Sequence, residues 1–319
     1  MALDNAATNI SNTAAVMRAV LLAMIPGVAA MLWFFGFAAL SNIVLSAIFS
    51  VLFEALALRW RKQPLRPLLF DGSVIITALL LALALPPGAS VWLLAIGCGV
   101  AVLLAKHAFG GYGQNMFNPA MAGYALLLIL FPAAFTQWPT PGELDGVTGA
   151  TTLNVFKQNS AQLVDAWWQS HPRYFGSIGG YGWEWINAAF LAGGLWLLYR
   201  KIFTWHIPLT LLAILGLCAA IFYDNGSSAS GGSPLFHAFS GATMLGAFFV
   251  ATEPVTAPRH IISRVIYGAA IGLLIFSIRY IGRYADGVAF AVLLGNAIAP
   301  LLDRITALLP SLTERRDER

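Results

Sequence analysis

The stretch FDGSVIITALLLALALPP at residues 70–87 decides the fold, because FSGATMLGAFFVATEPV at residues 239–255 follows the same plan. Both begin with Phe-x-Gly, continue through small and branched residues, and reach a proline at or near the end. Each is followed by two further hydrophobic runs and an Asn–Pro element, NMFNPAMAG at 115–123 and GNAIAP at 295–300. The pair predicts an internal repeat.

The composition indicates a membrane protein. The 319 residues are 59% hydrophobic and 10% charged, with a mean hydropathy of +0.75, whereas about a quarter of a soluble domain is charged. A bilayer core of ~30 Å takes roughly 20 apolar residues per helix. Runs near this length lie at 16–36, 37–58, 70–86, 90–106, 118–135, 185–199, 206–223, 238–253, 263–279 and 287–307.

These runs predict ten spans, five in each half. Because five is odd, the two halves cross the membrane in opposite directions, as in proteins whose binding sites lie near the midplane at broken helices. We therefore predict an all-α integral membrane protein of about ten transmembrane helices in two inverted five-helix repeats. It forms one membrane domain over 1–319, which comprises a first half at 16–135, a loop at 136–184, a second half at 185–307 and a tail at 308–319.

The basic residues predict the orientation, since cytoplasmic loops carry the excess of Lys and Arg. With the N-terminus in the cytoplasm, 14 of the 18 Lys and Arg residues lie inside. Both termini are then cytoplasmic, and the loop at 136–184 is periplasmic. The first run is expected to stay as a span, because a largely polar segment precedes it and no small-residue cleavage motif follows it. The net charge of +4 reflects this topology, and no nucleic-acid partner is expected.

Several chemistries are not predicted. Cys98 and Cys218 lie in separate apolar runs and offer neither a disulfide framework nor a CxxC pair. The five histidines lack HxxxH or HxH spacing, so no protein-ligated metal or haem is expected. Within the loop, the stretch LNVFKQNSAQLVDAWWQS at 153–170 predicts one amphipathic helix on the membrane surface.

The loop also carries ELDGVTGATTLN at 143–154, and its Thr-Gly-Ala-Thr is nearly repeated as Ser-Gly-Ala-Thr at 240–243. The first copy resembles the Asp-x-x-Ser/Thr-Gly-Ala-Thr signature at which a flavin transferase esterifies the phosphate of FMN to the last threonine. The alternative is an ordinary Gly-rich turn. For the second copy, which has His237 where the aspartate would stand, we expect helix packing or the lining of an ion path.

The resemblance gives the role of Thr151, and the chemistry of the residue types suggests roles for its neighbours. Thr151 would hold FMN, Gly149 and Ala150 would leave room for the phosphate and the transferase, and Thr148 completes the motif. Asp145 would position the hydroxyl or a metal ion during attachment.

Two further stretches, GGYGQNMFNPAMAG at 110–123 and GAFFVATEPVTAP at 246–258, resemble the membrane subunits of the RnfD/NqrB family of ion-pumping oxidoreductases. The first span begins near residue 16 without a long preceding segment, which favours the RnfD type. The resemblance implies electron transfer between ferredoxin and NAD⁺, coupled to Na⁺ or H⁺ translocation across a bacterial inner membrane. It implies subunits A, B, C, E and G as partners, which carry the nucleotide and iron–sulfur chemistry, together with a flavin transferase and membrane lipid.

Other polar residues have two interpretations each. Asn115 and Asn118 match the motif that the family associates with non-covalent riboflavin, and amides can bond a flavin; alternatively, they cap a broken helix. Asp71 and Glu253 are candidates for ion handling. Simple pairing with neighbours in sequence, or a position at the interface, is expected for Glu54, five residues from Arg59, and for Asp303, next to Arg304.

The rival function is a channel or secondary transporter of similar inverted-repeat plan, carrying a small solute with no redox role. Ten spans, inverted halves and asparagines at the midplane fit it equally well. The motif from Asp145 to Thr151 and the two family-like stretches favour the redox subunit.

Overall fold

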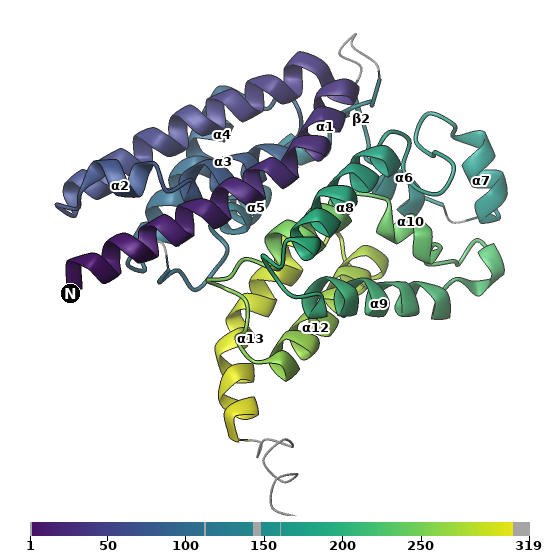
Figure 1. Ribbon diagram of the computed structural model, residues 1–319. Coiled ribbons are helices and arrows are strands. Elements are labelled where there is room, and N and C mark those ends of the chain that lie inside the picture. The colour runs from purple at the N-terminus through teal and green to yellow at the C-terminus, as the bar shows by residue number, and fades with distance from the viewer. Residues whose placement is uncertain (1, 112, 143–147, 160, 309–319) are drawn as a thin grey trace, which may run out of the picture.

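The computed structural model describes residues 2–308 except 112, 143–147 and 160, and it describes no side chains for 2–12, 67 and 148. The described chain is mostly helical, with one pair of two-residue strands, β1 (Trp138–Pro139) and β2 (Thr148–Gly149), paired antiparallel (Figure 1). Asp145 of the flavin motif lies outside the described residues.

Helix α1 (Ala2–Trp60) is a hairpin of two arms, 2–35 and 37–60. The arms meet at Gly36, whose backbone is non-helical with φ of 54°, a region that glycine enters without a Cβ penalty. Figure 1 shows the purple ribbon reverse there and return alongside itself. The two first runs predicted at 16–36 and 37–58 therefore correspond to the two arms.

The rest of the first half begins with α2 (Leu65–Leu69) and α3 (Ser73–Ala84). Between them Gly72 has φ of 88° and ends any continuous helix. Helix α4 (Val91–Gly99) continues directly into the π-helix η1 (Val100–His107), and α5 (Pro119–Leu130) follows, with the short 3₁₀ turn η2 (Pro132–Phe135) after it. π-helical turns are rare and are frequent at functional sites.

The second half repeats this outline. Its helices are α8 (Trp183–Tyr199), α9 (His206–Ile221), α10 (Pro234–Ala238), α11 (Thr243–Leu245) with the π-helix η4 (Gly246–Val250), α12 (Ile261–Tyr280) and α13 (Val288–Leu308); the 3₁₀ turn η3 (Asp224–Gly226) precedes α10. Gly241, with φ of 61°, separates α10 from α11 as Gly72 separates α2 from α3. A five-residue helix, a left-handed glycine and a second helix thus occur in both halves.

Helix lengths differ from the expectation of ten uniform spans. Each predicted run contains helix, but only three described helical stretches are long and apolar enough to cross a membrane by themselves: Thr13–Trp60, Ile261–Tyr280 and Val288–Leu308. Helices α3 and α5 have 12 residues each, which rise ~18 Å and are short of a ~30 Å core. Helix α3 is shorter than its run because Gly72 begins it late, and α5 is shorter because it ends at Leu130, two residues before Pro132.

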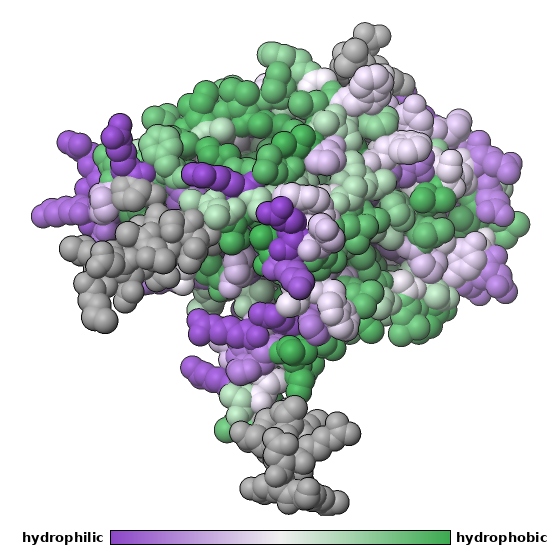
Figure 2. Space-filling model, viewed as in Figure 1, coloured by the Kyte–Doolittle hydropathy of each residue, from purple (hydrophilic) through white to green (hydrophobic). Residues whose placement is uncertain are grey.

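The molecular surface is strongly apolar. Trp33 and Phe37, at the tip of the α1 hairpin, are 83% and 80% exposed. Figure 2 shows hydrophobic side chains spread broadly over the α1 face, with hydrophilic ones at its left end. A soluble monomer rarely exposes so continuous a patch, and this surface is suited to lipid.

Glycines allow the closest helix contacts, as is usual in membrane bundles. A Cβ placed on Gly193 of α8 would overlap the carbonyl oxygen of Ala23 in α1, whereas at Gly216 of α9 the nearest atom, Cβ of Pro234, is 3.8 Å away. We expect Gly193→Ala to destabilise the fold by about 1–3 kcal/mol through overpacking and Gly216→Ala to have little effect. Thermal unfolding of the detergent-solubilised protein measures both, and equal midpoints for the two variants would contradict the prediction.

The loop at 136–184 contains two short helices, α6 (Thr152–Lys157) and α7 (Val164–Ser170). The single surface helix predicted for 153–170 is therefore wrong. The chain leaves the helix after Lys157, and Leu153, Val155 and Phe156 are buried in a small core with Phe236 of α10. The apolar spacing that indicated a membrane surface instead reflects packing onto the protein.

Lys157, the last residue of α6, ties this loop to the second half. Its ammonium donates to the carbonyl oxygens of Ile278, Gly282 and Tyr284 at 3.1, 2.7 and 2.6 Å, at and beyond the C-terminal turn of α12. Burial, and then the nearby Arg279 cation, lower the pKa of Lys157. The contact satisfies carbonyls that the end of α12 leaves unpaired.

Candidate functional site

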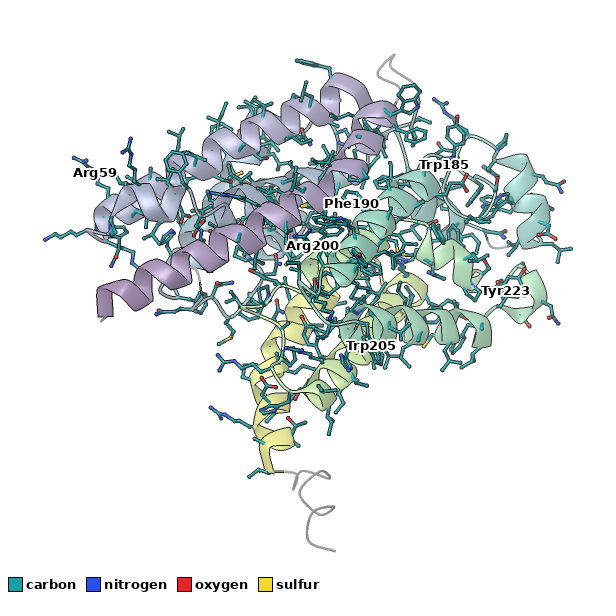
Figure 3. The ribbon with its side chains drawn as sticks, viewed as in Figure 1. Arg59, Trp185, Phe190, Arg200, Trp205 and Tyr223 are labelled. Carbon is teal, nitrogen blue, oxygen red and sulfur yellow. The ribbon has the colours of Figure 1, made fainter. Side chains whose placement is uncertain are left out.

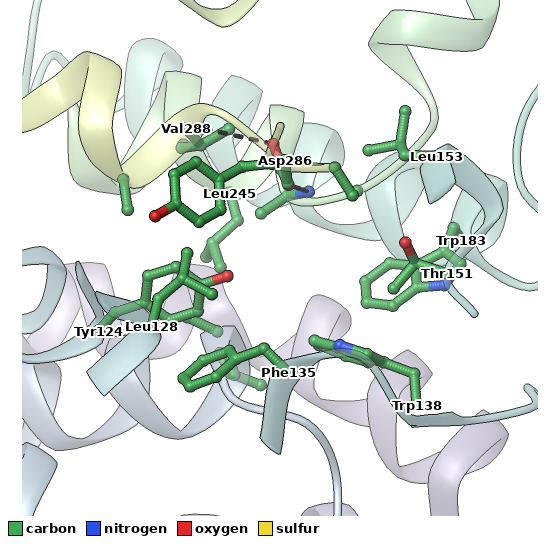
Figure 4. Close-up of a pocket in the computed structure, with 18 of the residues that line it drawn as sticks. Tyr124, Leu128, Phe135, Trp138, Thr151, Leu153, Trp183, Leu245, Asp286 and Val288 are labelled. Atoms are coloured by element: carbon green, nitrogen blue, oxygen red, sulfur yellow. Dashed lines mark hydrogen bonds between the residues drawn. The ribbon is translucent and has the colours of Figure 1, made fainter. Parts of the chain in front are cut away.

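A cavity of about 270 Å³ lies between the two halves, and Thr151 is on its wall. Four elements contribute aromatic rings to the lining: Tyr124 from α5, Phe135 from η2, Trp138 from β1 and Trp183 from α8 (Figure 4). Trp138 and Trp183 pack edge to face with centroids 5.4 Å apart. A flat, mostly apolar ligand with a few polar groups fits such a lining.

Thr151 is half-buried and is the N-cap residue of α6, where its Oγ1 accepts the backbone N–H of Asn154 at 3.3 Å. Threonine is favoured at this position because its oxygen satisfies an otherwise unpaired N–H. Thr148 and Gly149 form β2, so the motif crosses from strand to helix within four residues. A Cβ on Gly149 would lie 2.9 Å from the Tyr174 hydroxyl oxygen, which explains the small residue there.

Thr243, the matching threonine of the second copy, has a different environment. It is fully buried. Its Oγ1 donates to the carbonyl oxygen of His237 at 2.7 Å and accepts from Arg279 Nη2 at 2.9 Å. This hydroxyl is used inside the fold, whereas that of Thr151 borders a cavity.

His237 precedes the predicted eighth span and is buried beside this threonine. Burial lowers its pKa to about 3, and the Arg279 cation acts in the same direction. The imidazole is therefore neutral, and because the carbonyl oxygen of Gly231 can only accept, the Nε2 atom 2.7 Å away carries the proton.

This environment makes stability depend on pH. The folded pKa lies below the ordinary value of 6.5, so the contribution is complete above pH 6.5 and is lost as pH falls toward 3. At pH 5 the loss relative to pH 8 is about 2 kcal/mol by linkage. We expect His237→Gln, which can still donate to Gly231, to flatten the acid limb of a thermal-stability profile; an unchanged limb would contradict this role.

The polar groups at the break around Gly241 are paired with one another. Asp286 accepts from Arg279 Nη2 through Oδ1 at 2.9 Å and from the Ala242 N–H through Oδ2 at 2.8 Å. Asn187 of α8 donates to the Gly241 carbonyl oxygen at 2.9 Å and accepts the Met244 N–H at 3.0 Å. These contacts support the packing interpretation of the second tetrapeptide.

A second cavity of about 260 Å³ lies at the opposite end of α5 and includes Asn118 and Glu253 in its lining. Asn118 Oδ1 accepts the Met121 N–H at 3.1 Å, so this asparagine caps α5 as the structural alternative predicted. Asn115 donates to the Phe117 carbonyl oxygen, while its buried Oδ1 has no hydrogen-bond partner among the described residues. Of the two asparagines, only Asn118 lines this cavity.

The two candidates for ion handling are in different settings. Glu253, just after η4, accepts from Thr256 Oγ1 at 3.2 Å and faces the second cavity. Asp71 is buried and accepts both the N–H and the hydroxyl of Ser73 at 2.7 Å, where it caps α3. The structure does not bring these two carboxylates into direct contact.

The pairing expected for Glu54 with Arg59 is wrong. Glu54 is buried, and its two oxygens lie 2.8 Å from Lys106 Nζ and 3.1 Å from His107 Nε2, both at the end of η1. Arg61 Nη1 lies 3.3 Å from His107 Nδ1. Because a guanidinium only donates, Nδ1 accepts and Nε2 carries the proton toward Glu54.

Lys106 also donates to Ser73 Oγ at 3.0 Å and lines the second cavity. From the sequence, it was expected only as a cytoplasmic cation. The sequence does contain an indication that Lys106 is buried, because Lys106 and His107 directly continue an apolar run rather than lying in a polar loop.

Asp303 is likewise paired differently from the expectation. It accepts the backbone N–H groups of Arg259 at 2.9 Å and His260 at 3.3 Å, ahead of α12, rather than pairing with Arg304. Among the described residues, no group of three His, Cys, Asp or Glu could hold a metal ion.

Comparison with known proteins shows the family of this chain. Residues 6–309 match the NQR2, RnfD, RnfE family. The D subunit of the ion-translocating oxidoreductase complex of Cellvibrio japonicus is 47% identical over 93% of this chain and 90% of its own length. The proteins of the same name are 45% identical in Ectopseudomonas mendocina, over 93% of this chain and 91% of that protein, and 44% identical in Escherichia coli strain SE11, over 93% and 94%. The chain belongs to the NQR2, RnfD, RnfE family.

Proposed function

We propose that this chain is the RnfD-type membrane subunit of an ion-translocating oxidoreductase complex and carries FMN esterified to Thr151. The complex would move electrons between ferredoxin and NAD⁺ and couple them to Na⁺ or H⁺ translocation, with the nucleotide and ferredoxin chemistry on partner subunits. The observation that carries the proposal is the position of Thr151, half-buried on the wall of an aromatic cavity, within a chain whose relatives are named as such subunits.

The residues present fit FMN. The cavity walls offer flat aromatic surface, and Arg283 lines the same cavity with an exposed guanidinium that suits a phosphodiester. Thr151 would hold the cofactor, and the rings of Phe135, Trp138 and Trp183 would exclude water from it. Bound there, the flavin would supply electron acceptance and donation. Gly149 and Ala150 would give the transferase access, and Asp145 and Thr148 would complete the sequence that it recognises.

We propose the inverted ten-span topology on two further grounds. The five-residue helix, left-handed glycine and second helix recur in both halves, at Gly72 and Gly241. In addition, Arg59 lies at one end of the molecule, while Trp185 and Tyr223 lie toward the other (Figure 3). With both termini cytoplasmic, the halves at 16–135 and 185–307 flank a periplasmic loop at 136–184, and the tail at 308–319 is cytoplasmic.

The second cavity is the proposed position of a non-covalent riboflavin, on the cytoplasmic side of this topology. Asn118 lines it and Asn115 adjoins it in the chain, and the amides would bond the ring. Glu253, on its wall, and Asp71, next to the cavity-lining Ser73, are the proposed ion-handling carboxylates. The partners would be subunits A, B, C, E and G, a flavin transferase, and the lipid of a bacterial inner membrane.

The first test is chemical. The chain is expressed with and without a flavin transferase, denatured, and inspected for flavin fluorescence in the gel. A fluorescent band that depends on the transferase, and a peptide containing Thr151 whose mass is increased by an FMN ester, are expected. A dark band beside a transferase that labels a known substrate would remove the redox proposal, and solute uptake into liposomes would then test the transporter.

A further inference from the structure

Some of the polar groups that line the cavity beside Thr151 are bonded within the fold, and others are not. Asp286 and Asn187 line it, but both are bonded to the Gly241 break. Thr152 Oγ1 donates to the Tyr174 carbonyl oxygen at 2.9 Å. The hydroxyl of Tyr124 has no hydrogen-bond partner among the described residues, although its ring lies in the cavity wall.

The position of this hydroxyl is fixed by its surroundings. Tyr124 is in the second turn of α5, whose start is held by the Asn118 cap. Its ring packs edge to face on Phe135, with centroids 5.2 Å apart and planes at 88°. In Figure 4 Tyr124 and Thr151 stand on opposite sides of the cavity. A phenol held by packing at the inner wall, away from the tether, is a preorganised donor.

Tyr124 is half-buried, and a tyrosine whose ring packs in an apolar setting usually satisfies its hydroxyl. An unpaired phenol that packing holds in the cavity wall therefore points to a ligand with an acceptor atom at that position. A flavin has such atoms, since its ring carries two carbonyl oxygens and acceptor nitrogens along one edge. Phenylalanine would pack equally well on Phe135, so packing alone does not require the hydroxyl.

We propose that Tyr124 is a positioning residue for the tethered flavin and donates a hydrogen bond to an acceptor atom of the isoalloxazine ring. This inference rests on the proposed attachment at Thr151. Electron density on the carbonyl oxygens and N1 rises when the ring is reduced, so a bond to one of these atoms strengthens on reduction and favours the reduced form; N5 takes up a proton on reduction and would not act in this way. Tyr124 thereby raises the tendency of this flavin to accept electrons.

The test compares Tyr124→Phe with Tyr284→Phe, each in the full chain expressed with a flavin transferase. Both tyrosines line the cavity, but Tyr284 is 37% exposed and its ring packs against Phe290. Loading is read by in-gel fluorescence, and reduction by visible absorption during titration with dithionite against a reference dye. We expect full loading in both variants, and a reduced-to-oxidised ratio about 2- to 12-fold lower at a fixed potential in Tyr124→Phe alone, as the loss of one hydrogen bond allows.

Two outcomes overturn the inference alone. One is a loaded Tyr124→Phe variant whose titration and spectrum match the wild type. The other is a shift in Tyr284→Phe without one in Tyr124→Phe, which would place the ring at the mouth of the cavity. A wild-type chain that the transferase leaves dark would overturn the attachment at Thr151, and this inference with it.

Discussion

Thr151→Ala is expected to abolish covalent flavin fluorescence, whereas Thr243→Ala is expected to retain it. Esterification needs a hydroxyl, and that of Thr151 is bonded only to one backbone N–H at the edge of a cavity. The hydroxyl of Thr243 is fully buried and bonded to His237 and Arg279. Denatured-gel fluorescence, normalised to protein stain, measures the effect as all or none.

Thr151→Ser supplies the matched control, because serine also caps helices well and keeps a hydroxyl. We expect it to retain some labelling where alanine retains none. Thr243→Ala should lower thermal stability instead, because Arg279 then loses a buried acceptor, at a cost of about 1–3 kcal/mol. Fluorescence that survives in Thr151→Ala and disappears in Thr243→Ala would reverse the assignment of the two copies.

Lys106→Met is expected to destabilise the first half strongly. It removes the ammonium 2.8 Å from Glu54 and leaves that buried carboxylate with His107 as its remaining partner. Breaking a buried ion pair from one side typically costs about 3–5 kcal/mol. Thermal unfolding in detergent and the yield of monodisperse protein measure the loss.

The double variant Lys106→Met/Glu54→Gln tests whether the unpaired Glu54 carboxylate causes the loss of stability. Replacing both members of a buried pair is often nearly neutral, so we expect it to recover much of the stability lost in the single variant. Lys62→Met, at an exposed position, serves as the control and should change little. A double variant no more stable than Lys106→Met would show that the pair is not what holds these helices together.

The sequence predicted the positions of the helices because apolar runs are local properties of the chain. It predicted the break at Gly36, where the runs at 16–36 and 37–58 meet, but not the break at Gly72. Gly72 ends a helix through its φ angle, and the sequence alone does not distinguish it from the glycines inside α8. The sequence also did not predict the π-helices η1 and η4. A π-helix has i→i+5 rather than i→i+4 hydrogen bonds, and tertiary packing decides where this wider turn forms.

The candidate site was predicted in part. The motif around Thr151 is contiguous, so it can be identified from sequence, and the surrounding cavity was not predicted because Tyr124, Trp183 and Asp286 meet only after folding. Glu54 and Lys106 are 52 residues apart, and a nearby arginine was the more obvious partner. The loop helix at 153–170 was misread because burial against protein and against lipid produce the same apolar spacing.

The hydrogen bonds that Lys157 donates determine with which half of the protein Thr151 would move. Thr151 caps the short helix α6 that Lys157 ends, and Lys157 is fastened to the carbonyls beyond α12. Thr151, the proposed attachment residue, is therefore fixed to the second half, whereas Tyr124 and Phe135 belong to the first. Any sliding of one half against the other would draw a ring held at Thr151 across those walls, so the optical spectrum of such a ring would register the displacement between the halves.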